Sequence, residues 1–441
     1  MRLAATGPAS RTGHPMNVCM VAYAPYHYDT RLMCYAETLA ALGHTVDVFA
    51  LSAPGEKRRK TIRGVNLHPL LSRGRSERSP VSYLRKIMSF FVCAGALVTY
   101  RDLRKHYDLI HVHSVPDFLV FTAFLPSLRG ARVILDIHDL LPELYASKFG
   151  KSEASWVCRL LRYVERRSAA FADHVIAAND LWRTKLVSRS VREEKCSAIL
   201  TLPDRTLFRR RGRIRRDEKF IILYPGTLNH HQGVDIAIRA LDLIKHAAPT
   251  AEFHIYGAGP EEIALKQLTA ELSLQSRVKF HGIQPLSDIP GLMENADLGV
   301  VPKRNDLFGN EAFSTKTLEL MAMGVPIVVA DTAVDRYYFD ASIVKFFKAG
   351  DEASLADSIL LTIRDYGLRD KLVRNASRFV ARNDWGAHRH KYIDIVNFLT
   401  KPDASASSTR GAERFATERL VCAGVTHPQV GREAMISSTE C

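Results

Sequence analysis

Residues 305–331 read NDLFGNEAFSTKTLELMAMGVPIVVAD, and this stretch says most about the fold and the site. A polar loop leads into an apolar helix that begins near residues 314–316. The turn Met-Gly-Val-Pro at 323–326 and the buried-strand run Ile-Val-Val at 327–329 follow. Loop, helix, turn and strand in this order are typical of one unit of a parallel α/β sheet.

The start of that helix is suited to a phosphate. A hydroxyl of Ser314 or Thr315 can cap the helix by accepting a backbone N–H, and the helix end presents unpaired N–H groups and a positive dipole. Lys316 adds a mobile cation. Glu319, about one turn in, would accept ribose hydroxyls, and Glu311 would lie over the opposite end of the ligand. The pattern suits a nucleotide-sugar, although a surface helix with two solvated glutamates has the same spacing.

Apolar runs of strand type alternate with helical stretches in two halves of the chain. The runs of the first half are 18–22, 46–49, 109–112, 133–135 and 174–177. Those of the second half are 220–224, 252–256, 278–281, 298–301 and 327–329. Such alternation predicts two parallel sheets with helices on both faces. Ligands of such sheets bind beyond the carboxyl ends of the strands, so we expect the site in the cleft between the halves.

The same reading predicts the division of the chain. The Arg-rich stretch 209–217 is the natural linker, and the segment after Asp384-Trp385 opens a last helix. The expected parts are a disordered N-terminus (1–15), an acceptor-side Rossmann-like domain (16–208), a basic linker (209–217), a nucleotide-sugar-binding Rossmann-like domain (218–383), a crossing helix (384–400) and a disordered tail (401–441).

Composition restricts the setting. The chain has 441 residues, 46% of them hydrophobic, which is enough for two domains with their own cores. The first 16 residues lack the apolar region of a signal peptide, and no apolar run reaches the length expected of a membrane span. Seven scattered cysteines without a C-x-x-C pair indicate neither disulfides nor zinc. These features fit the cytoplasm.

The net charge of +14 is partly clustered. The clusters are residues 57–60, the set Arg73, Arg75, Arg78, Arg85 and Lys86, the set Arg159, Arg162, Arg166 and Arg167, and the arginines of 209–216. No nucleic-acid motif accompanies them, which leaves an anionic membrane surface or a solvated surface. The stretch 80–100 adds Tyr83, Phe90 and Phe91 to basic residues. It suits peripheral docking at the inner face of the plasma membrane, and a core helix explains the pattern equally well.

Three further motifs accompany Glu311 and Glu319: YPGTL at 224–228, FHIYGAGP at 253–260 and VKFHG at 278–282. Together they resemble the retaining glycosyltransferases of family 4, over roughly residues 17–400. The resemblance implies the GT-B fold, with two Rossmann-like domains facing across a cleft and a C-terminal helix that crosses back to the first domain. It also implies a nucleoside diphosphate sugar as donor, bound by the second half.

The donor site departs from the family pattern at two positions. Thr227 and Gln232 stand where the family usually has an Arg and a Lys that neutralise the leaving diphosphate. Lys303, Arg304 and Lys316 are candidate substitutes, and His230 and His231 can also donate hydrogen bonds. The glycine turns at Gly226 and Gly257 would let the backbone approach the donor closely.

No metal or other cofactor is expected. Metal-dependent glycosyltransferases of the other large fold hold a cation with D-x-D, and no two aspartates here are two apart. The helix N-terminus and basic side chains would then stabilise the phosphate charge.

The first half is expected to bind the acceptor. The stretch Asp-Ile-His-Asp-Leu-Leu-Pro-Glu at 136–143 follows a strand, so we expect His138, Asp139 and Glu143 near the cleft. The resemblance gives His138 a role near the transferred sugar, and a structural histidine is the alternative. Asp29 and Arg31 follow the first strand; they would lie near the acceptor, or Asp29 would only cap the next helix. The pair at 111 and 113 is expected in the cleft or core, without a third metal ligand.

The resulting hypothesis is transfer of a sugar to a hydroxyl of a glycan or lipid-linked acceptor, in cell-surface or exopolysaccharide synthesis. Glu311, His138 and Lys316 are the expected catalytic residues. Two alternatives stay open: a GT-B nucleotide-sugar epimerase, and a non-catalytic GT-B partner subunit with a degenerate donor site. Labelled nucleotide-sugars would separate transfer, epimerisation and binding.

Overall fold

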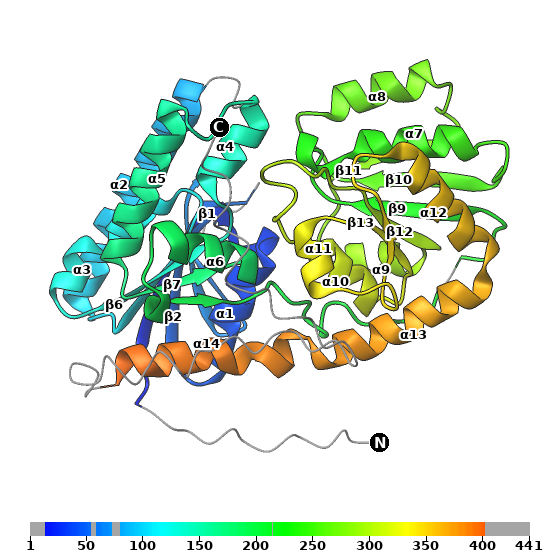
Figure 1. The fold of residues 1–441 in the computed structure, drawn as a ribbon. Coiled ribbons are helices and arrows are strands. Elements are labelled where there is room, and N and C mark those ends of the chain that lie inside the picture. Colours follow the sequence, from blue (N-terminus) through cyan, green and yellow to red (C-terminus); the bar gives the residue numbers. More distant parts are fainter. Residues whose placement is uncertain (1–13, 54–58, 73–79, 214, 402–441) are drawn as a thin grey trace, which may run out of the picture.

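A computed structural model describes residues 14–53, 59–72, 80–213 and 215–401. The expectations for the first residues, the tail from 402, Lys57, Arg58, Arg73, Arg75 and Arg78 fall outside this part of the chain. Within it the chain forms two α/β domains side by side (Figure 1).

The first domain is built on an eight-stranded sheet of order β3-β4-β2-β1-β5-β6-β7-β8. Its strands are β1 (Asn17–Pro25), β2 (Thr45–Ser52), β3 (Lys60–Ile62), β4 (Val65–Ser72), β5 (Leu109–His113), β6 (Arg132–Ile137), β7 (His174–Ala177) and β8 (Cys196–Ala198). Neighbours pair in parallel except β3 and β4. The central strands are covered on both faces, which is why they read as continuous apolar runs.

The second domain has a six-stranded parallel sheet of order β11-β10-β9-β12-β13-β14. Its strands are β9 (Phe220–Pro225), β10 (Ala251–Tyr256), β11 (Val278–Gly282), β12 (Leu298–Val301), β13 (Ile327–Ala330) and β14 (Lys345–Phe347).

Helices cover both sheets. The α-helices are α1 (Thr30–Ala41), α2 (Pro80–Arg104), α3 (Phe124–Leu128), α4 (Leu141–Phe149), α5 (Trp156–Phe171), α6 (Asp180–Arg189), α7 (Val234–Ile244), α8 (Glu262–Glu271), α9 (Ile289–Glu294), α10 (Thr315–Ala322), α11 (Ala333–Tyr338), α12 (Glu352–Arg364), α13 (Tyr366–Arg382) and α14 (Trp385–Thr400). Short 3₁₀ helices are η1 (Tyr26–Tyr28), η2 (Asp117–Ala123), η3 (Glu193–Lys195) and η4 (His230–Gln232).

The predicted GT-B architecture is confirmed, with two doubly wound halves and all ten predicted strands present. Helix α14 also runs where it was expected: Figure 1 shows α13 and α14 passing along one side of the molecule from the second domain to the first. Asp384 caps α14 by accepting from the backbone N–H of Ala387 at 2.8 Å.

Helix α14 is held on the first domain by aromatic packing. The rings of Tyr392 and Tyr35 lie 4.1 Å apart, and the hydroxyl of Tyr392 is 2.9 Å from Nδ1 of His111. The indole N–H of Trp385 donates to Oγ1 of Thr38 at 2.9 Å. The chain after the second domain therefore completes the core of the first.

Helix α2 differs from two expectations, one about its length and one about the burial of Phe90. Within it, Ser82–Arg104 is long and apolar enough by length and composition to cross a membrane, although the sequence reading found no such stretch. Phe90, expected at a membrane interface, is fully buried with its ring 5.2 Å from that of Tyr23. One side of α2 thus belongs to the core: Ile87, Phe90, Ala94 and Val98 are buried at helical spacing.

Replacing Tyr392 tests the crossing helix. Tyr392→Ala removes a large buried ring, so we expect the free energy of unfolding of the first domain to fall by about 3–5 kcal/mol. Tyr392→Phe removes only the hydrogen bond to His111 and should cost about 1 kcal/mol. Denaturant unfolding followed by tryptophan fluorescence measures both. Equal stability of wild type and Tyr392→Ala would show that α14 contributes little to the first domain.

Candidate active site

A cavity of about 510 Å³ lies between the two domains. Residues of both domains line it, and the carboxyl ends of β1, β6 and β9 open toward it. The lining residues are Ala24, Tyr28, Asp29, Thr30, Arg31, His138, Asp139, Leu144, Ala178, Trp182, Thr201, Thr227, Asn229, His231, Gln232, Lys303, Phe308, Ala312, Phe313, Ser314, Thr315 and Lys316. The predicted cleft is therefore present, and it gathers most of the residues predicted to act there.

Lys316 lies along the wall of the cavity that the second domain forms. A Cβ added at Gly226 would come 1.8 Å from Cε of Lys316, so a side chain at this position would require the Lys316 side chain to move. Nζ of Lys316 donates to Oε1 of Gln232 at 3.3 Å, and the hydroxyl of Tyr224 donates to the same oxygen at 3.1 Å. Gln232 thus orients Lys316 at a position where the family usually has a lysine.

Gly257 supports this arrangement from behind. Its φ is +145°, and a Cβ there would lie 1.9 Å from the carbonyl oxygen of Gly226. The two glycine turns after β9 and β10 can therefore touch only without side chains. Neither glycine lines the cavity; their role in the structure is to let Lys316 and the loop of Thr227 do so.

Two ionisable groups of α10 are perturbed by their surroundings. Burial lowers the pKa of Lys316 to about 8, although Glu319 acts in the opposite direction. Burial raises the pKa of Glu319 to about 7, offset in part by Lys316 and a hydrogen bond with Thr315. Both groups therefore titrate near neutral pH, as binding and catalytic groups often do. Glu319 lies one turn behind the cavity wall and does not line it.

The predicted cap of α10 is only partly correct. Ser314 occupies the N-cap position, but its side chain accepts no hydrogen bond from the helix. Its hydroxyl is buried without a hydrogen-bond partner among the described residues, while Ser314 and Thr315 both line the cavity. The amino end of α10 therefore faces the cavity with its own donors and an unused hydroxyl, which suits an anionic ligand.

The other two predicted cations are committed elsewhere. Lys303 lines the cavity but is 1% exposed, and its ammonium lies 2.7 Å from Oδ2 of Asp335 and donates to the carbonyl of Ala312 at 2.7 Å. Arg304 points away from the cavity toward Asp235, with Nη2 2.6 Å from Oδ2. Arg304 is therefore not a donor-site cation in this arrangement, because a carboxylate on α7 already binds it.

The opposite wall carries a polar network centred on Asp136. Nε and Nη2 of Arg31 donate to its two oxygens at 2.7 Å each, and Nε2 of His138 is 3.1 Å from Oδ2. Burial acts to lower the pKa of His138, but the charge of Asp136 and their hydrogen bond more than offset it, and the pKa is raised. His138 thus reaches the cavity as a positioned hydrogen-bond donor.

Three other residues predicted on the acceptor side line the cavity but have different partners. Asp29 caps α1, since its Oδ1 accepts from the N–H of Leu32 at 2.9 Å, and it also lines the cavity. Its place near the acceptor stays a prediction. Asp139 lines the same cavity and a neighbouring one of about 210 Å³, and burial raises its pKa. Arg31 lines the cavity but is 4% exposed because Asp136 holds it.

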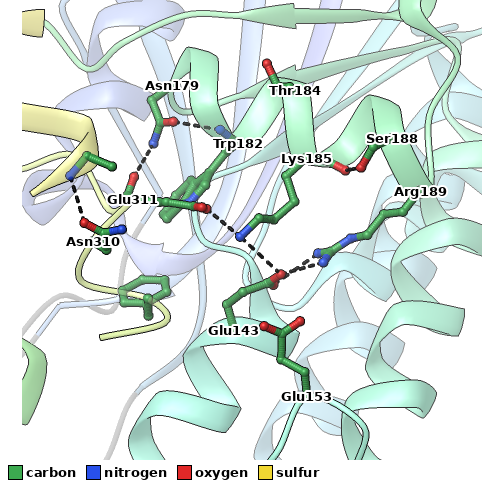
Figure 2. Close-up of polar contacts among 12 residues, drawn as sticks. Glu143, Glu153, Asn179, Trp182, Thr184, Lys185, Ser188, Arg189, Asn310 and Glu311 are labelled. Carbon is green, nitrogen blue, oxygen red and sulfur yellow. Dashed lines mark hydrogen bonds and ion pairs between the residues drawn. The ribbon is translucent and has the colours of Figure 1, made fainter. Parts of the chain in front are cut away.

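Glu143 is not an acceptor-side residue of this cavity. It is 1% exposed, and both its oxygens bind Arg189, at 2.5 and 3.1 Å. Glu311 also lies outside the lining: its carboxylate pairs with Lys185 of α6 at 2.6 Å (Figure 2). The motif spacing gave no indication of these partners, because both contacts join segments far apart in the sequence.

The histidine pair has the third potential ligand that the sequence did not suggest. His111, His113 and Asp136 place ligand atoms within 4.8 Å of one another, all buried. Arg31 already holds both oxygens of Asp136, and Tyr392 holds Nδ1 of His111. Burial lowers the pKa of His113 to about 4, so the pair stays neutral. These residues form a structural network under the cavity floor.

Sequence reasoning missed the aromatic wall. Trp182 of α6 and Phe308 of the β12–α10 loop line the cavity from opposite domains, with ring centroids 5.5 Å apart. Asn229 was also missed. The motif Leu-Phe-Gly at 307–309 precedes Glu311 and is a signal that could have pointed to Phe308.

Two family models match the chain and together cover most of the described residues. Residues 28–200 match the glycosyl transferase 4-like domain, and residues 205–379 match glycosyl transferases group 1. These matches fall on the two halves that face the cavity. With this architecture they define a glycosyltransferase of the GT-B class.

The chain belongs to glycosyltransferase family 4, as the motifs indicated. It is 25% identical over 418 residues to a phosphatidyl-myo-inositol mannosyltransferase of Propionibacterium freudenreichii, covering 91% of this chain and 96% of that protein. It is 26% identical over 242 residues to an uncharacterised glycosyltransferase of Methanocaldococcus jannaschii, covering 49% of this chain and 60% of the relative. A putative colanic acid biosynthesis glycosyltransferase of Salmonella typhimurium is 25% identical over 157 residues, 35% of this chain and 39% of the relative.

Solved structures agree on the fold. Sucrose-phosphate synthase from Thermosynechococcus elongatus superposes with a TM-score of 0.70 at 17% identity, over 87% of this chain and 99% of that chain. The lipopolysaccharide glycosyltransferase WaaG has a TM-score of 0.64 at 16% identity, over 86% and 99% of the two chains. At these identities the likeness shows the fold alone.

The perturbed Lys316 generates a pH prediction. Its ammonium is protonated below about pH 8 and neutral above, so affinity for a diphosphate should fall as the pH rises through about 8. A bound diphosphate would raise that pKa, and proton uptake should accompany binding at about pH 9. Titration calorimetry of nucleoside diphosphates in two buffers of different ionisation enthalpy measures both effects.

Two variants control that measurement. Lys316→Arg keeps the charge across this range and should show no loss of affinity between about pH 7 and 9. Lys316→Met should lose roughly tenfold in affinity at pH 7, about 1.4 kcal/mol, and show no alkaline dependence. An unchanged pH profile in Lys316→Met would assign the titration to another group.

Proposed function

We propose that this protein transfers a sugar from a nucleoside diphosphate sugar to a hydroxyl of a glycan or lipid-linked acceptor, with retention of the anomeric configuration and without a metal ion. The observation that carries the proposal is the cavity itself. One wall offers Lys316 and the amino end of α10, and the other offers His138 and Asp29. An anionic donor and a polyhydroxylated acceptor fit these two walls.

The donor is argued from charge. Lys316 and the open end of α10 attract a diphosphate. Glu319, one turn along α10 and outside the cavity lining, is proposed to accept ribose hydroxyls. Glu311 is proposed to contact the sugar from the loop that precedes α10. Solved structures of Anabaena HepE, which shares this fold, contain UDP and UDP-glucose, which supports a donor of this class.

The chemical step requires stabilisation of the leaving group. The bond from the anomeric carbon to the phosphate oxygen breaks, and the acceptor oxygen bonds to the same face of that carbon. The acceptor proton passes to the departing phosphate. Lys316 and the N–H groups of α10 stabilise the developing phosphate charge, which is an electrostatic role of oxyanion-hole type. His138 donates a hydrogen bond to the transferred sugar.

This route is preferred to a double displacement. A covalent glycosyl-enzyme needs a carboxylate at the anomeric carbon. Among the described lining residues the carboxylates are Asp29 and Asp139, and both belong to the acceptor-side wall. Asp29 is already engaged as the cap of α1.

The acceptor class is argued from the same wall and from the relatives. The name of the Propionibacterium protein states transfer to phosphatidyl-myo-inositol, and that of the Salmonella protein states colanic acid biosynthesis. Both support a glycan or lipid-linked acceptor in cell-surface synthesis. Neither the epimerase nor the non-catalytic alternative is favoured by any of the relatives.

A transfer assay tests the proposed function. The protein is incubated with radiolabelled nucleoside diphosphate sugars and a membrane extract as acceptor, with EDTA throughout. We expect transfer or slow donor hydrolysis that EDTA leaves unchanged, because Lys316 and α10 supply the charge. Activity lost on chelation and restored by magnesium or manganese would contradict metal independence. Epimerised donor without transfer would replace the proposed reaction.

A membrane surface is proposed on the outer side of the first domain. Phe91 of α2 packs on Phe118 of η2, and Phe121 of η2 packs on Phe171 of α5, so the two helices flank η2 in one layer (Figure 1). This layer exposes large apolar side chains: Leu84, Met88 and Val92 on α2, and Trp156, Leu160 and Tyr163 on α5.

The charges of this layer are complementary to anionic lipid. Its two helices carry one acid each, Asp102 and Glu165, and both are 1% exposed and bound to arginines. The exposed charges described on α2 and α5 are basic, among them Arg85, Arg159, Arg166 and Arg167. Apolar stripes flanked by basic residues suit reversible binding to a membrane surface. The proposed surface therefore comprises α2 and α5 together, whereas the sequence predicted the residues from Arg73 to Tyr100.

Vesicle binding tests this surface. The protein should sediment with phosphatidylglycerol vesicles at low salt and much less at high salt, since each basic residue contributes about 1 kcal/mol near an anionic surface. Changing Arg159, Arg166 and Arg167 to Glu should abolish binding. A matched triple change of Lys371, Arg374 and Arg378 to Glu on α13 should leave it intact. Binding that persists in the first variant would mean that α5 is only a solvated face.

A further inference from the structure

Helix α6 of the first domain meets the loop of Glu311 from the second domain. Nδ2 of Asn179, at the start of α6, donates to the carbonyl oxygen of Glu311 at 3.0 Å. The hydroxyl of Tyr338 of α11 accepts from the N–H of Asp180 at 2.8 Å and donates to its carboxylate at 2.6 Å. Figure 2 shows the side chains of Asn179 and Lys185 pointing at this loop. The start of α6 thus binds the second domain at two places, the backbone of Glu311 and the side chain of Tyr338.

The same loop is also held by its apolar side. Phe308 is 3% exposed and packs in the core cluster of the first domain, against Trp182 of α6. Trp182 lines the cavity together with Ala312, the residue after Glu311. The backbone of Glu311 is therefore anchored at the cavity rim by contacts from α6.

The side chain of Glu311 has its own partner on α6. Nζ of Lys185 lies 2.6 Å from Oε2 of Glu311 and 3.9 Å from Oε1 of Glu143 (Figure 2). Glu143 is held in turn by Arg189, which also binds Glu165. Three carboxylates thus share two cations, and Lys185 is the cation between the two domains.

We propose that Lys185 is a positioning residue that holds the carboxylate of Glu311 for the donor sugar. This inference rests on the proposed function. Lys185 binds Oε2, which leaves Oε1 of Glu311 to accept a sugar hydroxyl. Without the ammonium, Glu311 would face the buried carboxylate of Glu143 and turn away from it. The first domain thus completes the sugar end of the donor site.

A double-mutant cycle tests this role. Lys185→Met should lower kcat by roughly 10- to 100-fold, since small misplacements of a positioning group cost rates of that order. The KM for the donor and the Kd for nucleoside diphosphate should stay within about threefold, because the nucleotide end is bound elsewhere. Lys185→Arg keeps the charge and should retain most activity. The double variant with Glu311→Gln should be no slower than Glu311→Gln alone.

A matched control and an independent readout complete the test. Lys266→Met removes another lysine–glutamate pair, on the outer face of α8, and should behave as wild type. Without substrate, the backbone amides of residues 305–314 should exchange hydrogen faster in Lys185→Met than in the wild type. Wild-type kcat in Lys185→Met, or additive losses in the double variant, would overturn the proposal.

The two readouts separate failure of the inference from failure of the proposed function. If wild type transfers no sugar, the proposed function fails, and hydrogen exchange alone decides whether Lys185 orders the loop. Faster exchange in Lys185→Met would support the positioning contact, and unchanged exchange would overturn it.

Discussion

The site depends on one constraint: the loop between β12 and α10 belongs to the second domain, but its Phe308 is buried in the core of the first. Phe308 enters the core cluster of the first domain beside Trp182, and Asn179 binds the backbone three residues further along. Burial of one such aromatic side chain contributes about 1.5–3 kcal/mol. This contact holds the loop that leads through Glu311 to the amino end of α10 at the cavity rim. A second connection, α14, joins the domains on the other side.

Two lysines line the cleft, and their partners differ. The family position that usually holds a lysine holds Gln232 here, and Gln232 binds Lys316, which reaches the same region from α10. A cation thus lies on the neighbouring helix, and its side chain passes over Gly226, where a Cβ would displace it. Lys303 is instead paired with a carboxylate, because its ammonium is buried and Asp335 lies beside it. We propose that Lys316 compensates locally for this departure from the family pattern.

The sequence predicted the parts of the fold that depend on local pattern. Buried parallel strands read as apolar runs, and all ten such runs are strands. It missed β3, β8 and β14, which are three-residue edge strands without such a run, and β4, where Asn66, His68 and Pro69 interrupt the apolar residues. Phe90 and Arg304 were misjudged for a related reason: which face of a helix is buried, and which carboxylate a cation meets, depend on segments distant in the chain.

The same limit applies to the site. The motifs and the family resemblance together predicted Lys316, Thr227, Gln232, His138 and Asp139 at the cleft, and all of them line the cavity. They could not show that Glu143 is buried under Arg189, or that Glu311 meets Lys185, because both contacts form only after folding. The two glutamates of the signature thus have different surroundings: Glu319 is held within its own helix, and Glu311 is held by the other domain.

That difference is the central claim, and titration calorimetry tests it most directly. Nucleoside diphosphates are titrated into wild type, Glu319→Ala and Glu311→Ala. The account predicts that one of them binds the wild type, that Glu319→Ala weakens this binding by roughly tenfold or more, and that Glu311→Ala leaves it within about threefold. Equal loss of nucleotide affinity in both variants, or loss only in Glu311→Ala, would contradict it.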